Sequence, residues 1–383
     1  MCNLGDICDI TSSKRIFASE YRLFGVPFFR GKEIIEKQAG KNVSTEIFIE
    51  EERYNDIAKR FGVPQEGDIL LTSVGTLGIP YVVRDEKFYF KDGNLTWIKN
   101  FRETDSTYIY YWLLSPFGKA QIDQKCIGST QKALTIDALL KFEIDLPDLE
   151  TQRTVIATLR ALDDKIENNT KINHNLEQQA QAIFKSWFVD NAPAEWEHTK
   201  LGSITTEIRT KVKERRIPVL SAVKTGELIL SEEYFTKQVF SKDIGKYIVV
   251  EPSEFAYNPA RVNIGSLGIN SFDYAGCVSP VYVIFRSIPE YHNYLSFFFK
   301  SPNFQEEVKV RASGSVRQSL NYGDFSLIQV LLPSIEIIRI FNYQFEGFLS
   351  AKKRLSEENA RLIELRDYLL PRLMSGELSV ANI

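Results

Sequence analysis

One internal repeat constrains the fold of this chain more than any other feature of its sequence. The segment Gly128–Leu134 (GSTQKAL) matches the segment Gly314–Leu320 (GSVRQSL) at an offset of 186 residues. A constant offset that persists without a gap indicates two copies of one structural unit rather than a chance match. The chain therefore consists of two copies, each a variable globular part followed by a helix. The further pairs at this offset are Leu146-Pro147 with Leu332-Pro333, Arg153 with Arg339, and Leu176 with Leu362.

The globular parts have the pattern of mixed α/β domains. Short β-rich runs bounded by Gly and Pro, such as residues 68–72 and 281–285, predict strands. Aromatic-rich segments at 108–114 and 294–300 predict helices, and each is followed by a Ser-Pro pair. Proline lacks an N–H and disfavours a helical residue before it, so these helices end or begin there.

After each Leu-Pro pair the pattern changes to that of a long helix. Apolar residues recur there at alternating steps of three and four, which is the seam of a coiled coil. An amphipathic helix packed on its own domain is the alternative, but about 40 residues at 1.5 Å each span ~60 Å, more than one small domain covers. Polar residues interrupt the seam at Asn169, Asn173, Lys352 and Asn359. The predicted seam residues are Val155, Leu159, Leu162, Ile166, Leu176, Ala180, Ile183 and Trp187, then Phe341, Phe345, Phe348, Leu362, Arg366, Leu369 and Leu373.

These patterns predict an α+β fold in which two mixed α/β domains are joined by two long antiparallel helices with pseudo-two-fold symmetry. Helix two must run back along helix one if the two are to pair, because it starts from the second domain. The expected boundaries are 1–147 for domain one, 148–190 for helix one, 191–333 for domain two, and 334–383 for helix two with a C-terminal tail.

Composition limits the possible functions. Hydrophobic residues make up 44% and charged residues 25% of the chain, as in ordinary globular proteins. No apolar run approaches a membrane span, and the first residues do not form a secretion signal, so we expect a cytoplasmic protein without membrane contact. The four cysteines and three histidines lack metal-site spacing, so reduced thiols and no metal are expected. With a net charge of −3, any DNA contact must come from local basic clusters.

Several motifs resemble those of the specificity subunits of type I restriction-modification enzymes, and the resemblance covers essentially the whole chain. They are the strand entry Gly67–Leu70 with the Gly-x-x-Gly turn after it, the Gly-Ser-Thr-Gln loop, the Leu-Pro helix entry with Gln152-Arg153, and the terminal segment Leu365–Leu378. The second copy departs from this pattern in having Ile338-Arg339 at its helix entry and Arg-Gln instead of Gln-Lys in its Gly-Ser loop.

The resemblance implies a function without catalysis in this chain. Each globular part would be a target recognition domain that reads one half of a bipartite, asymmetric site in double-stranded DNA. The helices would set the gap between the half-sites and dock two methyltransferase subunits, and a motor-nuclease subunit would complete the restriction complex. The chain would itself hold no cofactor, with the methyl donor and ATP bound by the partner subunits.

The sequence offers little for an enzymatic reading. Asn258-Pro259-Ala260-Arg261 is faintly similar to the motif with which amino-methyltransferases hold a flipped base, but it lacks the stacking aromatic residue and no Gly-rich donor loop precedes it. No phosphate loop of the Gly-x-x-x-x-Gly-Lys type is present. The acid pair Asp163-Asp164 lies among charged residues on a predicted helix and is expected to be solvated surface.

Candidates for DNA contact follow from the chemistry of recognition. Lys and Arg bind phosphates, and Arg, Lys, Asn, Gln, Ser and Thr pair with base edges in the major groove. The candidates are Lys14, Arg15, Arg30, Lys32, Ser129, Thr130, Gln131 and Lys132 in the first copy, and Arg209, Lys211, Lys213, Arg261, Asn263, Ser315, Arg317 and Gln318 in the second.

Two other functions stay open at the level of sequence. The chain could be a two-headed coiled-coil scaffold that binds protein partners, or a two-headed DNA-binding regulator, although regulators usually obtain two half-sites from symmetric dimers. A gel shift with random duplex DNA, run with and without a methyltransferase partner, separates these possibilities.

Overall fold

The structure is a computed structural model, and it describes all residues except 41–42, 129–131, 235–239, 242, 312–318 and 379–383. The chain divides into two compact units. Unit 1 consists of Met1–Lys171 and Leu355–Ile383, and unit 2 is the continuous segment Ile172–Arg354. Each long helix contributes one part to each unit, so unit 1 is built from both ends of the chain.

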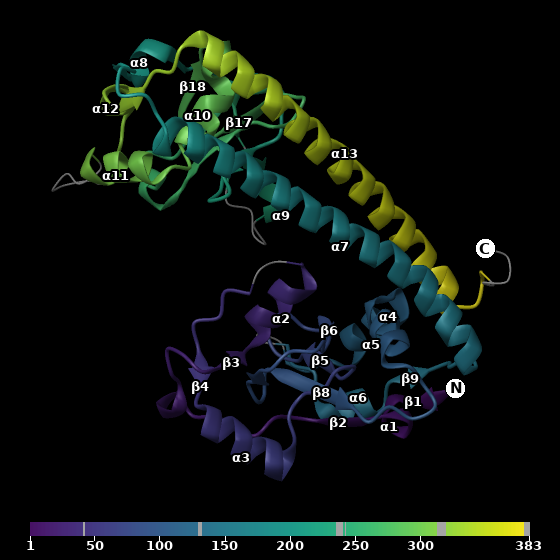
Figure 1. Ribbon diagram of the computed structural model, residues 1–383. Coiled ribbons are helices and arrows are strands. Elements are labelled where there is room, and N and C mark those ends of the chain that lie inside the picture. Colours follow the sequence, from purple (N-terminus) through teal and green to yellow (C-terminus); the bar gives the residue numbers. More distant parts are fainter. Residues whose placement is uncertain (41–42, 129–131, 235–239, 242, 312–318, 379–383) are drawn as a thin grey trace. The chain divides into compact units, whose positions relative to one another are not determined.

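Unit 1 is organised around a four-stranded sheet with the order β2-β8-β5-β6, in which all pairs are antiparallel. A three-stranded sheet of order β4-β3-β7 and a two-stranded sheet of β1 and β9 complete the strands (Figure 1). The strands are β1 (Cys2–Asn3), β2 (Asp9–Thr11), β3 (Val26–Phe29), β4 (Phe48–Ile49), β5 (Ile69–Thr72), β6 (Pro80–Val82), β7 (Tyr89–Phe90), β8 (Leu95–Lys99) and β9 (Glu143–Ile144).

The short helices of unit 1 lie between these strands. Their ends follow local sequence signals: Ser115 caps α5 through a bond from the Gly118 amide, and Pro116 occupies its first turn, where no N–H is needed. The helices are α1 (Leu4–Ile7), η1 (Ala18–Glu20), α2 (Gly31–Gln38), α3 (Glu51–Phe61), α4 (Ser106–Leu114), α5 (Pro116–Lys125) and α6 (Ile136–Leu140).

Unit 2 repeats the same core arrangement. Its four-stranded sheet has the order β11-β18-β15-β16, which matches β2-β8-β5-β6 strand for strand. The strands are β10 (His198–Lys200), β11 (Thr205–Ile208), β12 (Leu220–Ala222), β13 (Leu228–Leu230), β14 (Ile248–Val250), β15 (Phe255–Tyr257), β16 (Leu267–Ile269), β17 (Gly276–Val278), β18 (Val283–Ser287) and β19 (Gln329–Leu331). The helices are η2 (Ser186–Asp190), α8 (Leu201–Ile204), α9 (Ser231–Tyr234), η3 (Val262–Ile264), η4 (Pro289–Tyr291), α10 (His292–Phe298), α11 (Pro302–Arg311) and α12 (Tyr322–Ser326).

Equivalent contacts confirm that the sequence repeat is a structural repeat. The amide of Leu4 donates to the carbonyl of Phe142 at 2.7 Å, and the amide of Leu201 donates to the carbonyl of Ile328 at 2.9 Å. Helices α4, α5 and α6 correspond to α10, α11 and α12 at the offset of 186 residues. The expected fold class, two mixed α/β domains joined by two long helices, is confirmed.

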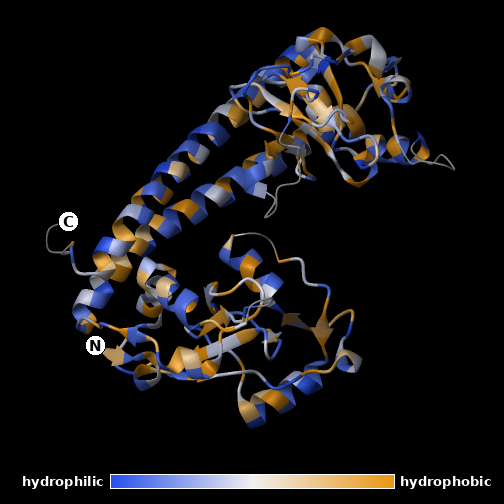
Figure 2. Cartoon of the chain, turned by 180° about the vertical axis from the view of Figure 1, so that it is seen from behind, coloured by the Kyte–Doolittle hydropathy of each residue, from blue (hydrophilic) through white to orange (hydrophobic). Residues whose placement is uncertain are grey.

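The long helices α7 (Leu149–Lys185) and α13 (Ile335–Met374) pack antiparallel within each unit (Figure 1). In unit 1 the side-chain amide of Asn169 donates to Asn359 at 2.9 Å, and Arg366 pairs with Asp163 at 3.0 Å. Hydropathy alternates along both helices in Figure 2, as expected for amphipathic helices that pack along one side.

Both ends of the helix pair take part in a domain core. Leu370, Leu373 and Met374 of α13 are buried in unit 1 against the apolar side chains of α4 and β5. In unit 2, Phe184 of α7 stacks on Phe297 with ring centroids 5.5 Å apart, and Phe341 of α13 is buried beside them. Each domain is therefore continuous in its packing with the helices that leave it.

A salt bridge joins the first domain to α7 in unit 1. The two terminal guanidinium nitrogens of Arg84 each lie 3.1 Å from an oxygen of the Glu167 carboxylate, which Lys171 also contacts at 2.7 Å. Hydrogen bonds from Arg84 and Lys171 lower the pKa of Glu167 to about 2. A depressed carboxyl pKa contributes stability above the unfolded-state pKa, and that contribution is lost as the pH falls through the folded-state value.

Replacing Glu167 by Gln is expected to lower the free energy of unfolding of unit 1 by about 1 kcal/mol at neutral pH, after allowance for solvent screening of a partly exposed pair. Because the wild-type carboxylate is itself protonated in acid, the difference should disappear between about pH 4.5 and pH 2. Hydrogen exchange of α7, followed as a function of pH in both proteins, measures this difference in the free energy of unfolding. Glu364→Gln, an exposed acid on α13 with no ion pair among the described residues, serves as control; an equal effect there would contradict the assignment.

Candidate nucleic-acid interface

In unit 1, three loops meet at the carboxyl end of β5. The amide of Ser73, just after β5, donates to the carbonyl of Asn94 at 2.8 Å, and the Ser73 carbonyl accepts from the Leu134 amide at 2.9 Å. The turn after β5, the turn between β7 and β8, and the strand that leaves the repeated Gly-Ser loop therefore lie side by side. We call this loop cluster the β5 edge.

Of the two candidate cations in the N-terminal segment, Arg15 contacts the β5 edge directly and Lys14 is next to it in the chain. Arg15 pairs with Asp92, in the turn between β7 and β8, at 2.9 Å. The Lys14 amide donates to the Tyr89 hydroxyl at 2.7 Å, and its ammonium lies 4.3 Å from the centroid of the Phe61 ring. Lys132 is exposed and has no ion-pair partner among the described residues. Lys132 is therefore the candidate whose charge is most available to a phosphate.

Arg30 and Lys32 reach the same edge but are paired within the chain. The Phe29 carbonyl accepts from the Lys91 amide at 2.9 Å, which brings the start of α2 to the turn between β7 and β8. The Arg30 guanidinium bonds at 2.7 Å to Glu33, whose carboxylate is fully buried. Lys32 lies 3.7 Å from Glu36, one helical turn on. A buried carboxylate needs its partner, so the Arg30 charge is used to stabilise the protein itself.

Unit 2 builds the equivalent edge at the end of β15. The Leu320 amide, just after the second Gly-Ser loop, donates to the Pro259 carbonyl at 3.0 Å. Arg261 is exposed in the loop that follows, and Asn263 is half-buried beside it. This β15 edge thus repeats the pairing of the Gly-Ser loop with the turn after the central strand.

The second basic cluster of unit 2 lies near the β15 edge. Lys211 forms a bridge with Ile248, which pairs in turn with Val278 at the end of β17. The chain then turns into β18, whose first residue, Val283, pairs with Tyr257 at the end of β15. Exposed Lys213 is close to Lys211 in sequence, whereas Arg209 is paired with Glu207 at 2.7 Å. Lys211 and Lys213 therefore supply charge that is unpaired among the described residues.

Six of the predicted contact residues lie outside the described residues, although the residues flanking them are placed. These are Ser129, Thr130 and Gln131 in the first Gly-Ser loop and Ser315, Arg317 and Gln318 in the second.

The predicted seam residues of α7 and α13 are all buried or half-buried. The buried face of the helix is broader near the second domain. There Phe184 and Phe188 are more deeply buried than the predicted seam residues Ile183 and Trp187. The reason is that α7 packs there against the aromatic side chains of the second domain as well as against α13. The fully buried members of the set are Val155, Leu159, Ala180, Phe341 and Leu373, and the half-buried members are Leu162, Ile166, Leu176, Ile183, Trp187, Phe345, Phe348, Leu362, Arg366 and Leu369.

Two sequence motifs have local structural roles. The side-chain oxygen of Asn258 accepts from the Ala260 amide at 3.0 Å and so closes a turn. Asp163, expected to be solvated, instead accepts from the Tyr111 hydroxyl at 2.8 Å and pairs with Arg366. Among the described residues, no cluster of His, Cys, Asp or Glu could hold a metal ion, and no helix is long and apolar enough to cross a membrane.

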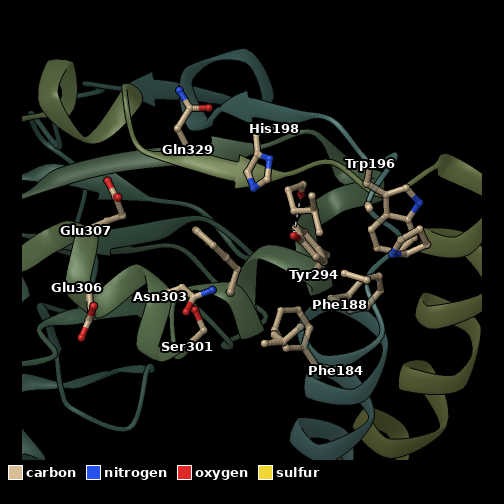
Figure 3. A pocket seen from close by; sticks show the side chains of 16 residues that line it. Phe184, Phe188, Trp196, His198, Tyr294, Ser301, Asn303, Glu306, Glu307 and Gln329 are labelled. Atoms are coloured by element: carbon tan, nitrogen blue, oxygen red, sulfur yellow. Dashed lines mark hydrogen bonds between the residues drawn. The ribbon is translucent and has the colours of Figure 1, made fainter.

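A pocket of about 560 Å³ lies elsewhere in unit 2, where η2 leads into β10 (Figure 3). Phe184, Phe188 and Tyr294 line its apolar part, and Glu306 and Glu307 also line it. Carboxylates repel a phosphate backbone, so this pocket is unsuited to join the β15 edge in binding DNA.

Sequence reasoning missed two cations at the edges. Lys91 lies in the turn between β7 and β8, and Lys224 packs on Gly265 in the loop after β15. Neither belongs to a basic cluster in the sequence. Only the pairing of the sheet strands reveals them, because it places single residues from distant segments of the chain at one edge.

Together the two edges have the chemistry of a nucleic-acid interface. Each combines exposed cations, the side chains that bind phosphates, with the placed residues that follow a Gly-Ser loop. The same construction occurs twice, once in each unit, with different side chains in each. An arrangement of this kind suits the reading of two different short sequences.

Comparisons with known proteins find type I specificity subunits that are similar to this chain. Residues 1–178 match the family model described as the type I restriction modification DNA specificity domain. The chain is 28% identical over 333 residues to the HindI specificity subunit of Haemophilus influenzae, covering 66% of this chain and 72% of that protein. It is 24% identical over 396 residues to the MjaIX specificity subunit of Methanocaldococcus jannaschii, covering 92% of this chain and 84% of that one.

A solved structure supports the fold across the whole chain. The crystal structure of the S subunit of a type I restriction-modification system from M. genitalium superimposes with a TM-score of 0.57. The alignment covers 97% of this chain and 94% of that chain, at 16% sequence identity. The resemblance to specificity subunits deduced from the motifs is confirmed.

Proposed function

We propose that this chain, whose residues 1–178 match the type I restriction modification DNA specificity domain, is a DNA-recognition subunit that reads a bipartite, asymmetric target. The β5 edge reads one half-site and the β15 edge reads the other. The paired helices α7 and α13 set the gap and dock two methyltransferase subunits. A motor-nuclease subunit joins to form the restriction complex.

One observation carries this proposal: the same loop edge is built twice, with different side chains. Two identical edges would suit a symmetric target, whereas Lys132 of the first copy corresponds to Gln318 of the second, so the two copies offer different contacts. The chain performs no chemistry in this scheme, because methyl donor and ATP are bound by the partner subunits. The subunit therefore acts by positioning its partners on DNA.

A binding and methylation experiment tests the proposal. Duplex DNA is incubated with the chain alone, with a methyltransferase subunit alone, and with both, and the shifts are compared. Methylated adenines are then mapped across the genome of cells with and without the gene. A two-part motif that depends on the gene is expected. If the chain bound proteins but neither it nor its complex bound DNA, the protein scaffold would be the better description.

Two alanine substitutions should distinguish a phosphate contact from a base contact. Lys132→Ala is expected to weaken binding of the complex to all sequences alike and to reduce the slope of log K against log salt by ~1. Gln131→Ala should instead cost ~1–3 kcal/mol on the cognate site and relax one base position. Titration of cognate and random duplexes at several salt concentrations measures both effects. Equal losses on both duplexes for Gln131→Ala would make it a phosphate contact.

A further inference from the structure

Arg153 and Arg339 occupy the same position in the two copies, and the proposed DNA-reading edges do not use them. Each is the fifth residue of its long helix, since α7 begins at Leu149 and α13 begins at Ile335. Both side chains are exposed, and neither has a hydrogen-bond or ion-pair partner among the described residues. Two exposed arginines without a hydrogen bond or close ion pair, at equivalent places in two diverged copies, call for an explanation.

The neighbouring residues differ between the copies although the arginines do not. Gln152 of α7 corresponds to Ile338 of α13, and Thr154 corresponds to Ile340. The side-chain oxygen of Gln152 accepts hydrogen bonds from the Thr104 hydroxyl and from the Asp105 amide, each at 3.0 Å. The second copy has replaced even this buried polar contact by an apolar one and has still kept the arginine.

Helix stability does not explain the arginines. The N-terminal end of a helix carries the positive end of its dipole, so a cation near it gains nothing from the dipole. Glu150 and Glu336, three residues before the arginines, are the charges that the dipole favours there. Arg339 does interact electrostatically with Glu336, but an exposed pair three residues apart on a helix adds only little to stability.

The position of the arginines also argues against contact with DNA. In unit 1, β8 starts at the β5 edge and leads to Thr104 and Asp105, which lie against the start of α7. In unit 2, β18 starts at the β15 edge and leads to Glu290, whose carbonyl accepts from Asn342 of α13 at 2.8 Å. A five-residue strand spans about 16 Å. Each arginine therefore lies at the opposite end of its sheet from the DNA-reading loops.

We propose that Arg153 and Arg339 each bind a carboxylate of one methyltransferase subunit, so that the two copies of the repeat recruit two identical partners through equivalent contacts. Guanidinium and carboxylate form paired, charge-assisted hydrogen bonds of defined geometry, which suits a docking contact. This inference rests on the proposed function, because it names residues through which that docking occurs. It differs from the docking surface expected along the helix seam, since both arginines point away from the seam.

Charge reversal in the full-length chain tests the inference. The variants Arg153→Glu, Arg339→Glu and the double variant are mixed with the methyltransferase subunit, and the stoichiometry is measured by native mass spectrometry and sedimentation. Each single variant is expected to bind one partner with unchanged affinity and the second at least tenfold more weakly. The double variant should lose both. Lys59→Glu, an exposed cation on α3 with no ion-pair partner among the described residues, is the control outside the docking helices and should bind two.

Each result has a defined meaning. Because the helix dipole favours an acid, the melting temperature of the variants should not fall, and a marked fall would indicate a structural role instead. Variants that bind two partners as tightly as the wild type overturn the inference and leave the proposed function intact. Variants that keep both partners but lose DNA would make the arginines phosphate contacts. A wild-type chain that binds no methyltransferase subunit would contradict the proposed function itself.

Discussion

Inserting seven residues into each long helix is expected to keep both half-sites of the methylated target and to widen the gap between them by about two to four base pairs. Seven residues lengthen a helix by ~10 Å and preserve the 3.5-residue repeat of the seam. DNA rises about 3.4 Å per base pair. Mapping of methylated adenines measures the gap directly.

The contacts within the helix pair show where the insertions belong. One follows Lys171 in α7 and the other follows Arg354 in α13, so both fall between the layer of Asn169 with Asn359 and the layer of Glu177 with Lys352. An insertion in only one helix moves those layers out of register and should abolish methylation. A functional double insertion with an unchanged gap would show that the methyltransferase subunits set the spacing.

Replacing Leu373 by Ala is expected to destabilise unit 1 by about 2–5 kcal/mol, the usual cost of truncating a fully buried leucine. Leu373 is 4% exposed and belongs to the core formed with α4 and β5, although it lies near the end of the chain. Hydrogen exchange should show the loss in the strands of unit 1 and leave those of unit 2 unchanged.

The matched control for this prediction is Leu365→Ala on the same helix. Leu365 is 45% exposed, so its truncation should change stability by less than about 0.5 kcal/mol. If Leu373→Ala destabilised both units equally, they would unfold as one cooperative body. If it had no effect on unit 1, the C-terminal turn of α13 would not be part of that core.

The repeat and the helix seam could be predicted because both depend on periodic spacing, which the sequence shows directly. The offset that aligns Gly128 with Gly314 also aligns α4 with α10 and α7 with α13. The three-and-four spacing likewise identifies helix residues such as Leu159 and Phe341 that are buried in the cores of the two units. Such patterns depend on neighbours in the chain, so no tertiary information is needed.

The available charges could not be predicted in the same way. Arg15 and Lys132 look alike as candidates, but Arg15 is paired with Asp92, 77 residues away. The pairing of Arg30 with buried Glu33 depends on how α2 packs, which spacing alone does not reveal. Which cations remain for DNA is thus decided by tertiary contacts. The grouping of loops at the β5 and β15 edges follows from strand order, which the sequence leaves open.

The discontinuity of unit 1 has a consequence for synthesis on the ribosome. Unit 2 is one continuous segment and has all its residues once Arg354 has been translated. The first domain to be translated must still wait for Leu370, Leu373 and Met374, which arrive only with the last turns of α13. Until then Val155 and Leu159 lack these partners in their core. The N-terminal domain is therefore the last to be completed, and a prematurely ended chain would present that unfinished apolar surface to chaperones and proteases.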